Sequence, residues 1–139
     1  MAQAITRDQV TRLFDAALAV QPHAHAPYSR FPVGAAVLDE AGAIHAGCNV
    51  ENAAYPLGVC AEASAIAAMI AHGAKRVRAL LVLGNGRELV TPCGGCRQRL
   101  REFADGDTPV LVAGRDGVRK EFTLGELLPE SFGPENLKP

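Results

Sequence analysis

Two uninterrupted apolar runs constrain the fold of this chain most: ALLVL at residues 79–83 and VLVA at residues 110–113. Strands that alternate apolar and polar residues keep one face in water, whereas continuous apolar runs are typical of strands buried on both faces. Residues 94–103, between the two runs, have the pattern of a helix. A strand, a helix and a strand in this succession predict a crossover unit in a sheet that helices cover.

The remaining segments add helices and strands around this unit. Thr6 and Gln9 form a capping-box pattern at the start of an amphipathic helix, and Gly42 marks a turn between two strands. Residues 60–71 are apolar nearly all round and predict a helix buried on several sides, with Gly73 as its end. We expect helices over residues 6–20, 60–71, 94–103 and 123–128, and strands over residues 31–39, 44–51, 79–83, 110–113 and 118–122. The predicted fold class is α/β, with three α/β/α layers and a five-stranded mixed sheet.

Length, charge and hydropathy narrow the class of protein. With 139 residues the chain has the size of one domain, which we expect to span residues 1–139. Its 14 basic and 15 acidic residues nearly cancel, so no overall positive field attracts nucleic acid or anionic lipid. No apolar run approaches the roughly 20 residues that cross a bilayer, and the first ten residues, MAQAITRDQV, lack the layout of a signal peptide. We therefore expect a cytoplasmic protein that binds neither nucleic acid nor membranes.

Three of the four cysteines lie where predicted helices begin. Cys60 belongs to VCAE at residues 59–62, and Cys93 and Cys96 form the C-x-x-C spacing of TPCGGC at residues 91–96. In sheets of this kind, ligands collect at the carboxyl ends of strands, where the following helices start. The partial positive charge of a helix N-terminus stabilises thiolates, and three protein ligands leave the fourth position of a catalytic zinc ion for water. The pattern favours a catalytic zinc site.

Glu62 supports a catalytic role for this cluster. Near the tip of a helix, its carboxylate can lie beside a metal that Cys60 holds, without being a ligand, and can accept and return a proton. The alternative is an acidic residue that only stabilises the helix N-terminus. Three other interpretations of the cysteines stay open: a redox C-x-x-C disulfide, a closed four-cysteine zinc site that includes Cys48, and buried free thiols. Because side chains alternate along a strand, Cys48 should face away from Asn49 and Glu51, which argues against the four-cysteine site.

Four stretches of the sequence resemble a known family. PYSRFPVGAAV at 27–37, GCNVENAAYPLGVCAE at 47–62, TPCGGCRQRLREF at 91–103 and LGELLPESF at 124–132 follow one another in the family's order over most of the chain. They include the Glu and Pro-Cys-x-x-Cys signature of zinc deaminases that act on nucleobases. More closely, the chain resembles the cytidine deaminases of the small, three-cysteine, homotetrameric type, which implies their fold and one zinc ion per chain.

The resemblance also implies a reaction. Zinc-dependent hydrolysis would convert cytidine and deoxycytidine into uridine and deoxyuridine with release of ammonia, as in pyrimidine salvage. In this reading Cys60, Cys93 and Cys96 would hold the metal, and Glu62 would shuttle protons.

The residues that would bind the nucleoside also follow from the resemblance. Seven residues match such positions: Phe31, Asn49, Glu51, Tyr55, Ala61, Thr91 and Phe132. Asn49 and Glu51, two apart on a strand, would face the ribose hydroxyls together. Tyr55 and Phe132 would come from neighbouring subunits of a homotetramer, which complete each other's pockets. Core packing is the alternative interpretation of Phe31 and Phe132.

One position departs from the family's pattern. Cysteine-only members usually have an arginine after the glutamate, which hydrogen-bonds the ligand thiolates, whereas this chain has Ala63. Three thiolates and a zinc dication leave net negative charge, which two helix N-termini offset in part. Arg97, next to Cys96, is the nearest candidate in the sequence for further compensation. An exposed arginine at a helix start is the alternative interpretation.

Three other functions compete with cytidine deamination. A zinc deaminase of another cytosine nucleoside, of the blasticidin type, also lacks that arginine, but the NVEN segment at residues 49–52 favours the cytidine enzymes. A deaminase that edits nucleic acid would need a basic surface, yet Arg97, Arg99 and Arg101 spread around their helix without an aromatic platform, as on a solvated helix face. A non-catalytic, zinc-stabilised interaction module would have no turnover for Glu62→Gln to abolish.

Overall fold

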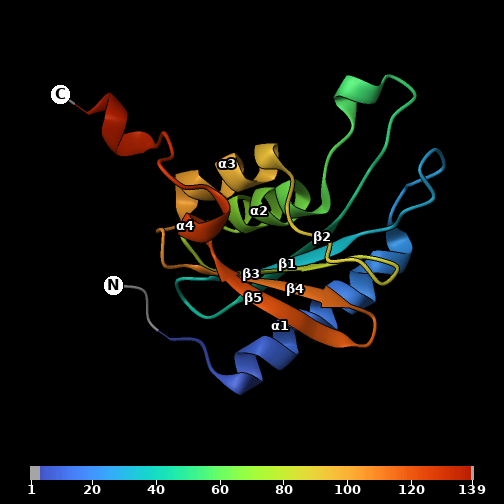
Figure 1. The fold of residues 1–139 in the computed structure, drawn as a ribbon, viewed down its shortest axis with the longest axis horizontal. Helices are drawn as coiled ribbons and strands as arrows, with labels where there is room; N and C mark the ends of the chain where they lie inside the picture. Colours follow the sequence, from blue (N-terminus) through green and yellow to red (C-terminus); the bar gives the residue numbers. More distant parts are fainter. Residues whose placement is uncertain (1–3, 139) are drawn as a thin grey trace.

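The computed structural model describes residues 4–138, and its sheet has five strands in the order β2-β1-β3-β4-β5 (Figure 1). The strands are β1 (Gly34–Asp39), β2 (Ile44–Cys48), β3 (Val77–Leu83), β4 (Pro109–Gly114) and β5 (Gly117–Thr123). The helices are α1 (Arg7–Val20), α2 (Ala61–Ala71), α3 (Gly94–Phe103) and α4 (Leu124–Leu127), with short 3-10 helices η1 (Gln21–His23), η2 (Tyr55–Leu57) and η3 (Pro134–Leu137). Residues 1–3 and 139 of the expected domain, 1–139, lie outside the described residues.

The predicted crossover is confirmed in the middle of the sheet. β3 pairs in parallel with β4, with Leu80 opposite Val110 and Leu83 opposite Ala113, and α3 connects the two strands. β1 is antiparallel to both β2 and β3, and β4 is antiparallel to β5. The sheet is therefore mixed, as expected. Because β1 lies between β2 and β3, the crossover through α2 passes over one strand.

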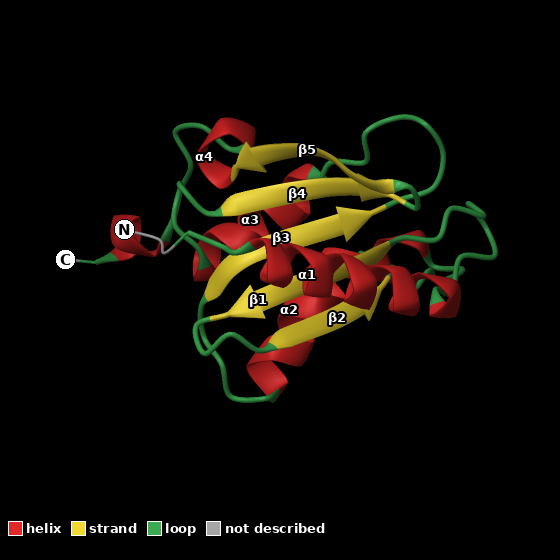
Figure 2. Ribbon diagram, turned by 90° about the horizontal axis from the view of Figure 1, so that it is seen from below, coloured by secondary structure: helices red, strands yellow, loops and turns green. Residues whose placement is uncertain are grey.

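Helices cover both faces of the sheet, as the three-layer prediction requires. α1 lies against one face, and α2 and α3 lie against the other (Figure 1, Figure 2). β3 contributes to both cores: Ala79, Leu81 and Leu83 pack in the cluster of α1, whereas Leu80 and Val82 pack in the cluster of α2 and α3. Burial on both faces explains why this strand has no polar residue in ALLVL.

The ends of α1 and α2 follow their sequence signals. The Thr6 hydroxyl accepts from the backbone N–H of Gln9 at 3.1 Å, and the Thr6 N–H donates to Gln9 Oε1 at 3.0 Å, so the capping box is confirmed. Gly73, just after α2, has a φ of +95°, a left-handed conformation that favours glycine. Among the helices of residues 4–138, none is long and apolar enough to cross a membrane.

The expected strand over residues 44–51 is too long, because β2 ends at Cys48. Beyond Cys48 the chain leaves the sheet: the carbonyl of Asn49 accepts from His25, and Val50 pairs with Val59. As a result, residues 49–60, including η2, extend away from the layers (Figure 1), and we call this segment the arm. The expected strand over residues 31–39 likewise starts only at Gly34.

Candidate active site

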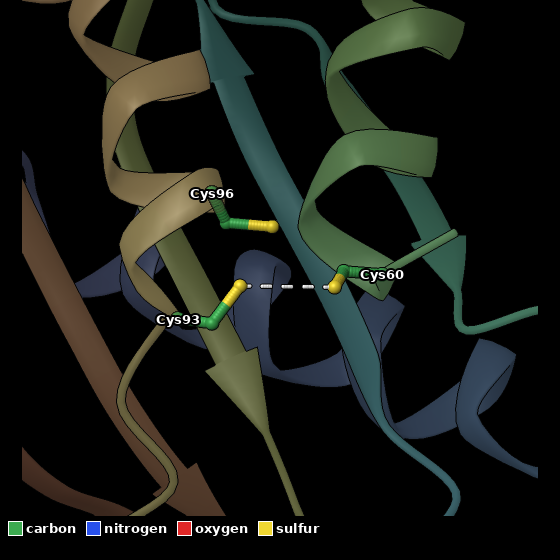
Figure 3. A group of neighbouring side chains, drawn as sticks. All are labelled: Cys60, Cys93 and Cys96. Carbon is green, nitrogen blue, oxygen red and sulfur yellow. Dashed lines mark hydrogen bonds between the residues drawn. The ribbon is translucent and has the colours of Figure 1, made fainter. Parts of the chain in front are cut away.

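The three predicted zinc ligands converge between the N-terminal ends of α2 and α3 (Figure 3). Cys60 is the N-cap of α2, Cys93 is the N-cap of α3, and Cys96 lies in the first turn of α3. The Sγ atoms of Cys60 and Cys93 are 3.8 Å apart, and all three sulfurs lie within 4.8 Å of one another. The β3–α3 connection thus brings the C-x-x-C pair against a cysteine from the preceding helix.

This cluster fits one zinc ion. Ligands placed tetrahedrally at a Zn–S distance of about 2.3 Å are about 3.8 Å from one another. Both helices direct the positive ends of their dipoles at the sulfurs, which stabilises the thiolates that bind zinc. Cys48 lies outside the cluster, so the closed four-cysteine site is wrong, and none of the cysteines forms a disulfide. Three protein ligands leave the fourth zinc position open, as in catalytic sites.

The protein affects the protonation of the three thiols differently. Burial raises the pKa of Cys60 and of Cys96. Burial acts in the same direction on Cys93, but hydrogen bonds with Cys96, first to its backbone N–H, outweigh it and lower the pKa of Cys93. Metal binding deprotonates a coordinating thiol outright. Zinc and the folded site are therefore expected to stabilise each other.

Glu62 lies beside the thiols, in the first turn of α2. The residue is 5% exposed, and burial raises the pKa of its carboxyl above the usual value. The negative charge of Glu62 acts against ionisation of all three cysteines, which shows that the carboxylate is within electrostatic range of each. A carboxylate that only stabilised the helix dipole would have no need of this burial. A raised pKa suits a group that takes up and gives back protons.

The arm brings Asn49, one of the two predicted sugar-binding residues, next to Cys60. Val50 and Val59 exchange two backbone hydrogen bonds, at 2.9 and 2.8 Å, so the antiparallel register places Asn49 opposite Cys60. The carboxamide of Asn49 holds the loop before β1: Nδ2 donates to the carbonyl of Phe31 at 3.0 Å, and Oδ1 accepts from a backbone N–H of the same loop at 2.8 Å. The loop and the arm therefore form one unit beside the metal ligands.

Glu51 lines a cleft of about 370 Å³. The cleft is formed by Tyr28, Ser29, Glu51, Asn52, Tyr55 and Gly58. The Glu51 carboxylate accepts from the Ser29 hydroxyl and from the backbone N–H groups of Tyr28 at 2.9 Å and Ser29 at 3.2 Å. These hydrogen bonds, first that of the Ser29 hydroxyl, lower the pKa of Glu51. Ser29 is absent from the predicted residues, although its hydroxyl within the matching PYSR stretch was an available signal.

The aromatic residues predicted at the site are exposed. Phe31 is 37%, Tyr55 75% and Phe132 57% exposed, so core packing is the wrong interpretation of Phe31 and Phe132. Tyr55 lies in η2 of the arm, where its ring meets that of Tyr28 edge-on with centroids 5.9 Å apart. Phe132 lies in the C-terminal segment, and its carbonyl accepts from Gln98 Nε2 at 2.9 Å. Both segments thus present aromatic rings outward.

The two predicted backbone contacts lie at the edges of the cysteine cluster. Ala61 is the first residue of α2, so its N–H has no acceptor within the helix. Thr91 precedes the Pro-Cys pair, and its hydroxyl accepts from Arg97 Nη2 at 3.2 Å. Ala61 is therefore next to Cys60 in the chain, and Thr91 is two residues before Cys93.

The arginines of α3 correct one prediction. Arg97 does not offset the thiolate charge by contact, because its Nε and Nη1 donate to backbone carbonyls at 2.7 and 2.8 Å. Arg99, and not Arg97, lies next to a thiol: its Nη1 is 3.7 Å from Sγ of Cys96. Arg101 pairs with Glu135, so the interpretation as a solvated helix face holds for neither Arg97 nor Arg101. The signal for Arg99 was its i+3 spacing from Cys96, which puts both side chains on one helix face.

Comparison with known proteins agrees with this arrangement. The model of the family described as the cytidine and deoxycytidylate deaminase zinc-binding region matches residues 7–112. The cytidine deaminases of Sporosarcina psychrophila and Halalkalibacterium halodurans are 41% and 39% identical over 128 and 125 residues, covering 92% and 90% of this chain and 94% and 95% of theirs. The crystal structure of cytidine deaminase from Burkholderia pseudomallei, 37% identical, superposes with a TM-score of 0.82 over 92% of this chain and 100% of that one. The chain belongs to the cytidine and deoxycytidylate deaminase family.

Proposed function

We propose that the protein catalyses the zinc-dependent hydrolytic deamination of cytidine and deoxycytidine to uridine and deoxyuridine, with release of ammonia. The observation that carries this proposal is the convergence of Cys60, Cys93 and Cys96 beside the buried Glu62. Three protein ligands leave one position of a tetrahedral zinc ion open, and a buried carboxyl next to it can move protons. Hydrolysis needs both an activated water and a proton carrier, and this site offers them together.

Cys60, Cys93 and Cys96 would hold the zinc ion, which would lower the pKa of a water molecule at neutral pH and so supply the nucleophile. Glu62 carries the protons. Its carboxylate takes one proton from the attacking water and delivers it to N3 of the cytosine ring. A second transfer through Glu62 reaches the amino nitrogen on C4, so that the C–N bond breaks and ammonia leaves. The oxygen of the water remains on C4, and one water is consumed for each ammonia released. Burial, which raises the pKa of Glu62, suits a carboxyl that has to accept and donate in turn.

The cleft at the arm is the proposed site of the sugar. Glu51 is held there as a carboxylate and can accept hydrogen bonds from sugar hydroxyls. The side-chain amide of Asn49 uses one N–H and one oxygen lone pair in its hydrogen bonds with the loop before β1. Its second N–H and second lone pair are available to a ligand. Phe31 would pack near the base and sugar, and the backbones of Ala61 and Thr91 would read the edge of the base.

Exposed apolar residues support a homotetramer. Tyr55 and Leu57 in the arm, and Phe132 and Leu137 in the C-terminal segment, are all more than half exposed. In a homotetramer, these segments would cover one another, and Tyr55 and Phe132 would complete the pockets of neighbouring subunits. Sedimentation of the purified protein should therefore give a tetramer. A stable monomer with full activity would contradict this assembly.

The proposal also covers the domain organisation of the chain, its location in the cell and the kind of ligand it binds. Residues 1–139 would form a single catalytic domain that acts in the cytoplasm, in pyrimidine salvage. The formal charge of −1 supports a small nucleoside as the ligand, because binding to polyanions such as nucleic acid depends on basic surfaces.

Incubating the zinc-loaded protein with cytidine, deoxycytidine and free cytosine, while following the cytosine absorbance band, tests the proposed reaction. We expect loss of the band with both nucleosides. Free cytosine should react poorly, because it cannot use the sugar contacts of Asn49 and Glu51. Conversion of neither nucleoside would contradict the proposal.

A further inference from the structure

The thiols and the carboxyl of the site carry more negative charge than one zinc ion can balance. With zinc bound as proposed above, three thiolates outweigh one dication, and the buried Glu62 adds negative charge whenever it is ionised. An excess of negative charge around a metal reduces its power to acidify water. The residue after Glu62 is Ala63, which offers neither charge nor a hydrogen-bond donor. A compensating cation has to come from another part of the chain.

Arg99 brings such a cation to the thiolates. Its Nη1 lies 3.7 Å from Sγ of Cys96, one turn earlier on α3. Cys96 is 1% exposed and is the most buried of the three ligands, so its thiolate has the least access to water and gains most from a charged donor. The guanidinium of Arg99 therefore acts directly on the ligand that is most shielded from water.

Arg99 approaches from the side that Ala63 leaves open. Both residues line one groove between α2 and α3, together with Ile66, Ala67 and Gln98. The guanidinium lies against the first turn of α3, because a Cβ added to Gly95 would be 3.4 Å from Nη1 of Arg99. A long cationic side chain at position 63 would enter the same groove. An arginine at either position 63 or position 99 could therefore place a positive charge in this groove.

The other arginines of α3 are engaged elsewhere. Arg97 donates to the carbonyls of Pro92 and Leu127 and to the hydroxyl of Thr91. Arg101 donates to the hydroxyl of Ser131 at 2.9 Å and pairs with Glu135. Among these three arginines, Arg99 is the one whose guanidinium lies within hydrogen-bond distance of a sulfur.

We infer that Arg99 is a positioning residue of the zinc site, which donates to the Cys96 thiolate and supplies the positive charge that position 63 lacks. The inference rests on the proposed zinc chemistry but not on the identity of the substrate. Hydrogen-bond partners of metal ligands typically contribute about 10–100-fold to metal affinity or activity. The expected effect of removing Arg99 is therefore large enough to measure directly on the metal.

Zinc release provides that measurement. An excess of a chromogenic zinc chelator is mixed with each zinc-loaded protein, and the rate of metal transfer is recorded. The proteins are wild type, Arg99→Gln, Arg99→Lys and the double variant Ala63→Arg/Arg99→Gln. Arg7→Gln is the matched control, because it makes the same chemical change at the exposed start of α1, on the other face of the sheet. We expect Arg99→Gln to release zinc about 10–100-fold faster than Arg7→Gln. Arg99→Lys or the double variant should recover most of this loss, since each returns a cation to the groove. In cobalt-substituted protein, the thiolate-to-cobalt absorption band should shift in Arg99→Gln and return in the rescued variant.

Two results would overturn the inference. One is zinc release from Arg99→Gln at the rate of Arg7→Gln. The other is faster release that neither Arg99→Lys nor Ala63→Arg relieves, because a packing defect alone would then explain it. Measuring cytidine turnover as well distinguishes failure of the inference from failure of the proposed function. If wild type retains zinc but converts no nucleoside, the proposed function fails while zinc release still decides the role of Arg99. If wild type deaminates cytidine and Arg99→Gln keeps its zinc, only the inference fails.

Discussion

Replacing Gly47 by alanine tests how β2 positions α2, the helix that carries Glu62. A Cβ at Gly47 would lie 2.4 Å from the backbone nitrogen of Ala65 and 2.6 Å from Cβ of Ser64, both in α2. Ordinary contact begins at 3.4 Å, so the strand and the helix have to separate by about 1 Å. Overpacking of this kind costs about 1–3 kcal/mol of the free energy of unfolding. A displacement of about 1 Å at a catalytic group costs about 100-fold in rate.

Gly34→Ala is the matched control for this substitution. Its Cβ would lie 2.2 Å from the carbonyl oxygen of Ala17 in α1, on the face of the sheet away from the cysteines. We expect Gly34→Ala and Gly47→Ala to lose similar stability in urea unfolding, because each forces a helix off the sheet. Only Gly47→Ala should lose about 100-fold in kcat on cytidine, measured where both variants are folded. Equal kcat values for the two variants would refute the reasoning that β2 sets the position of Glu62.

Two further predictions concern acid stability and the metal ligands. Burial acts to raise the pKa of Asp39, but its hydrogen bond to His45 at 2.7 Å and bonds from two backbone N–H groups lower it overall. The stability that Asp39 contributes is therefore complete above its unfolded pKa of about 3.9 and lost as the pH falls through the lower folded value. Asp39→Asn should unfold about 1–3 kcal/mol more easily at pH 7 and lose less stability below pH ~4 in urea titrations; an unchanged acid limb would contradict this. Cys93→Ser should contain well below one zinc per chain by metal analysis, whereas Cys48→Ser, outside the cluster, should keep its zinc; equal zinc contents would argue against the three-ligand site.

Local patterns predicted the elements of this fold, whereas pairing between distant segments set its details. The continuous apolar runs identified the parallel pair β3 and β4, because strands buried on both faces have no polar side to show. The position of β1 between β2 and β3, and the end of β2 at Cys48, could not be predicted in this way. They depend on contacts such as that of Val50 with Val59, which produce no periodic pattern of apolar residues in either segment.

At the site, too, local sequence patterns predicted some residues, whereas contacts between distant segments could not be predicted. The metal ligands could be predicted because each cysteine stands at a helix start, and the topology brings those starts together. Arg97 was the nearest candidate in the sequence because it is adjacent to Cys96. Adjacent side chains on a helix diverge, however, and Arg99 contacts the sulfur instead. The bond from Ser29 to Glu51 joins residues that are 22 positions apart, so the PYSR stretch could indicate Ser29 as a site residue but not Glu51 as its partner.

Comparing Glu62→Gln with the unchanged protein, for zinc content, thermal unfolding and cytidine turnover, tests the central claim most directly. Glutamine keeps the size and polarity of the side chain in its buried position but cannot carry a proton between water and the base. We predict about one zinc ion per chain and a similar unfolding temperature in both proteins, with kcat lower by about 10²–10⁴-fold in the variant. If Glu62→Gln deaminates cytidine at the rate of the unchanged protein, Glu62 is not the proton carrier, and the account of this site is wrong.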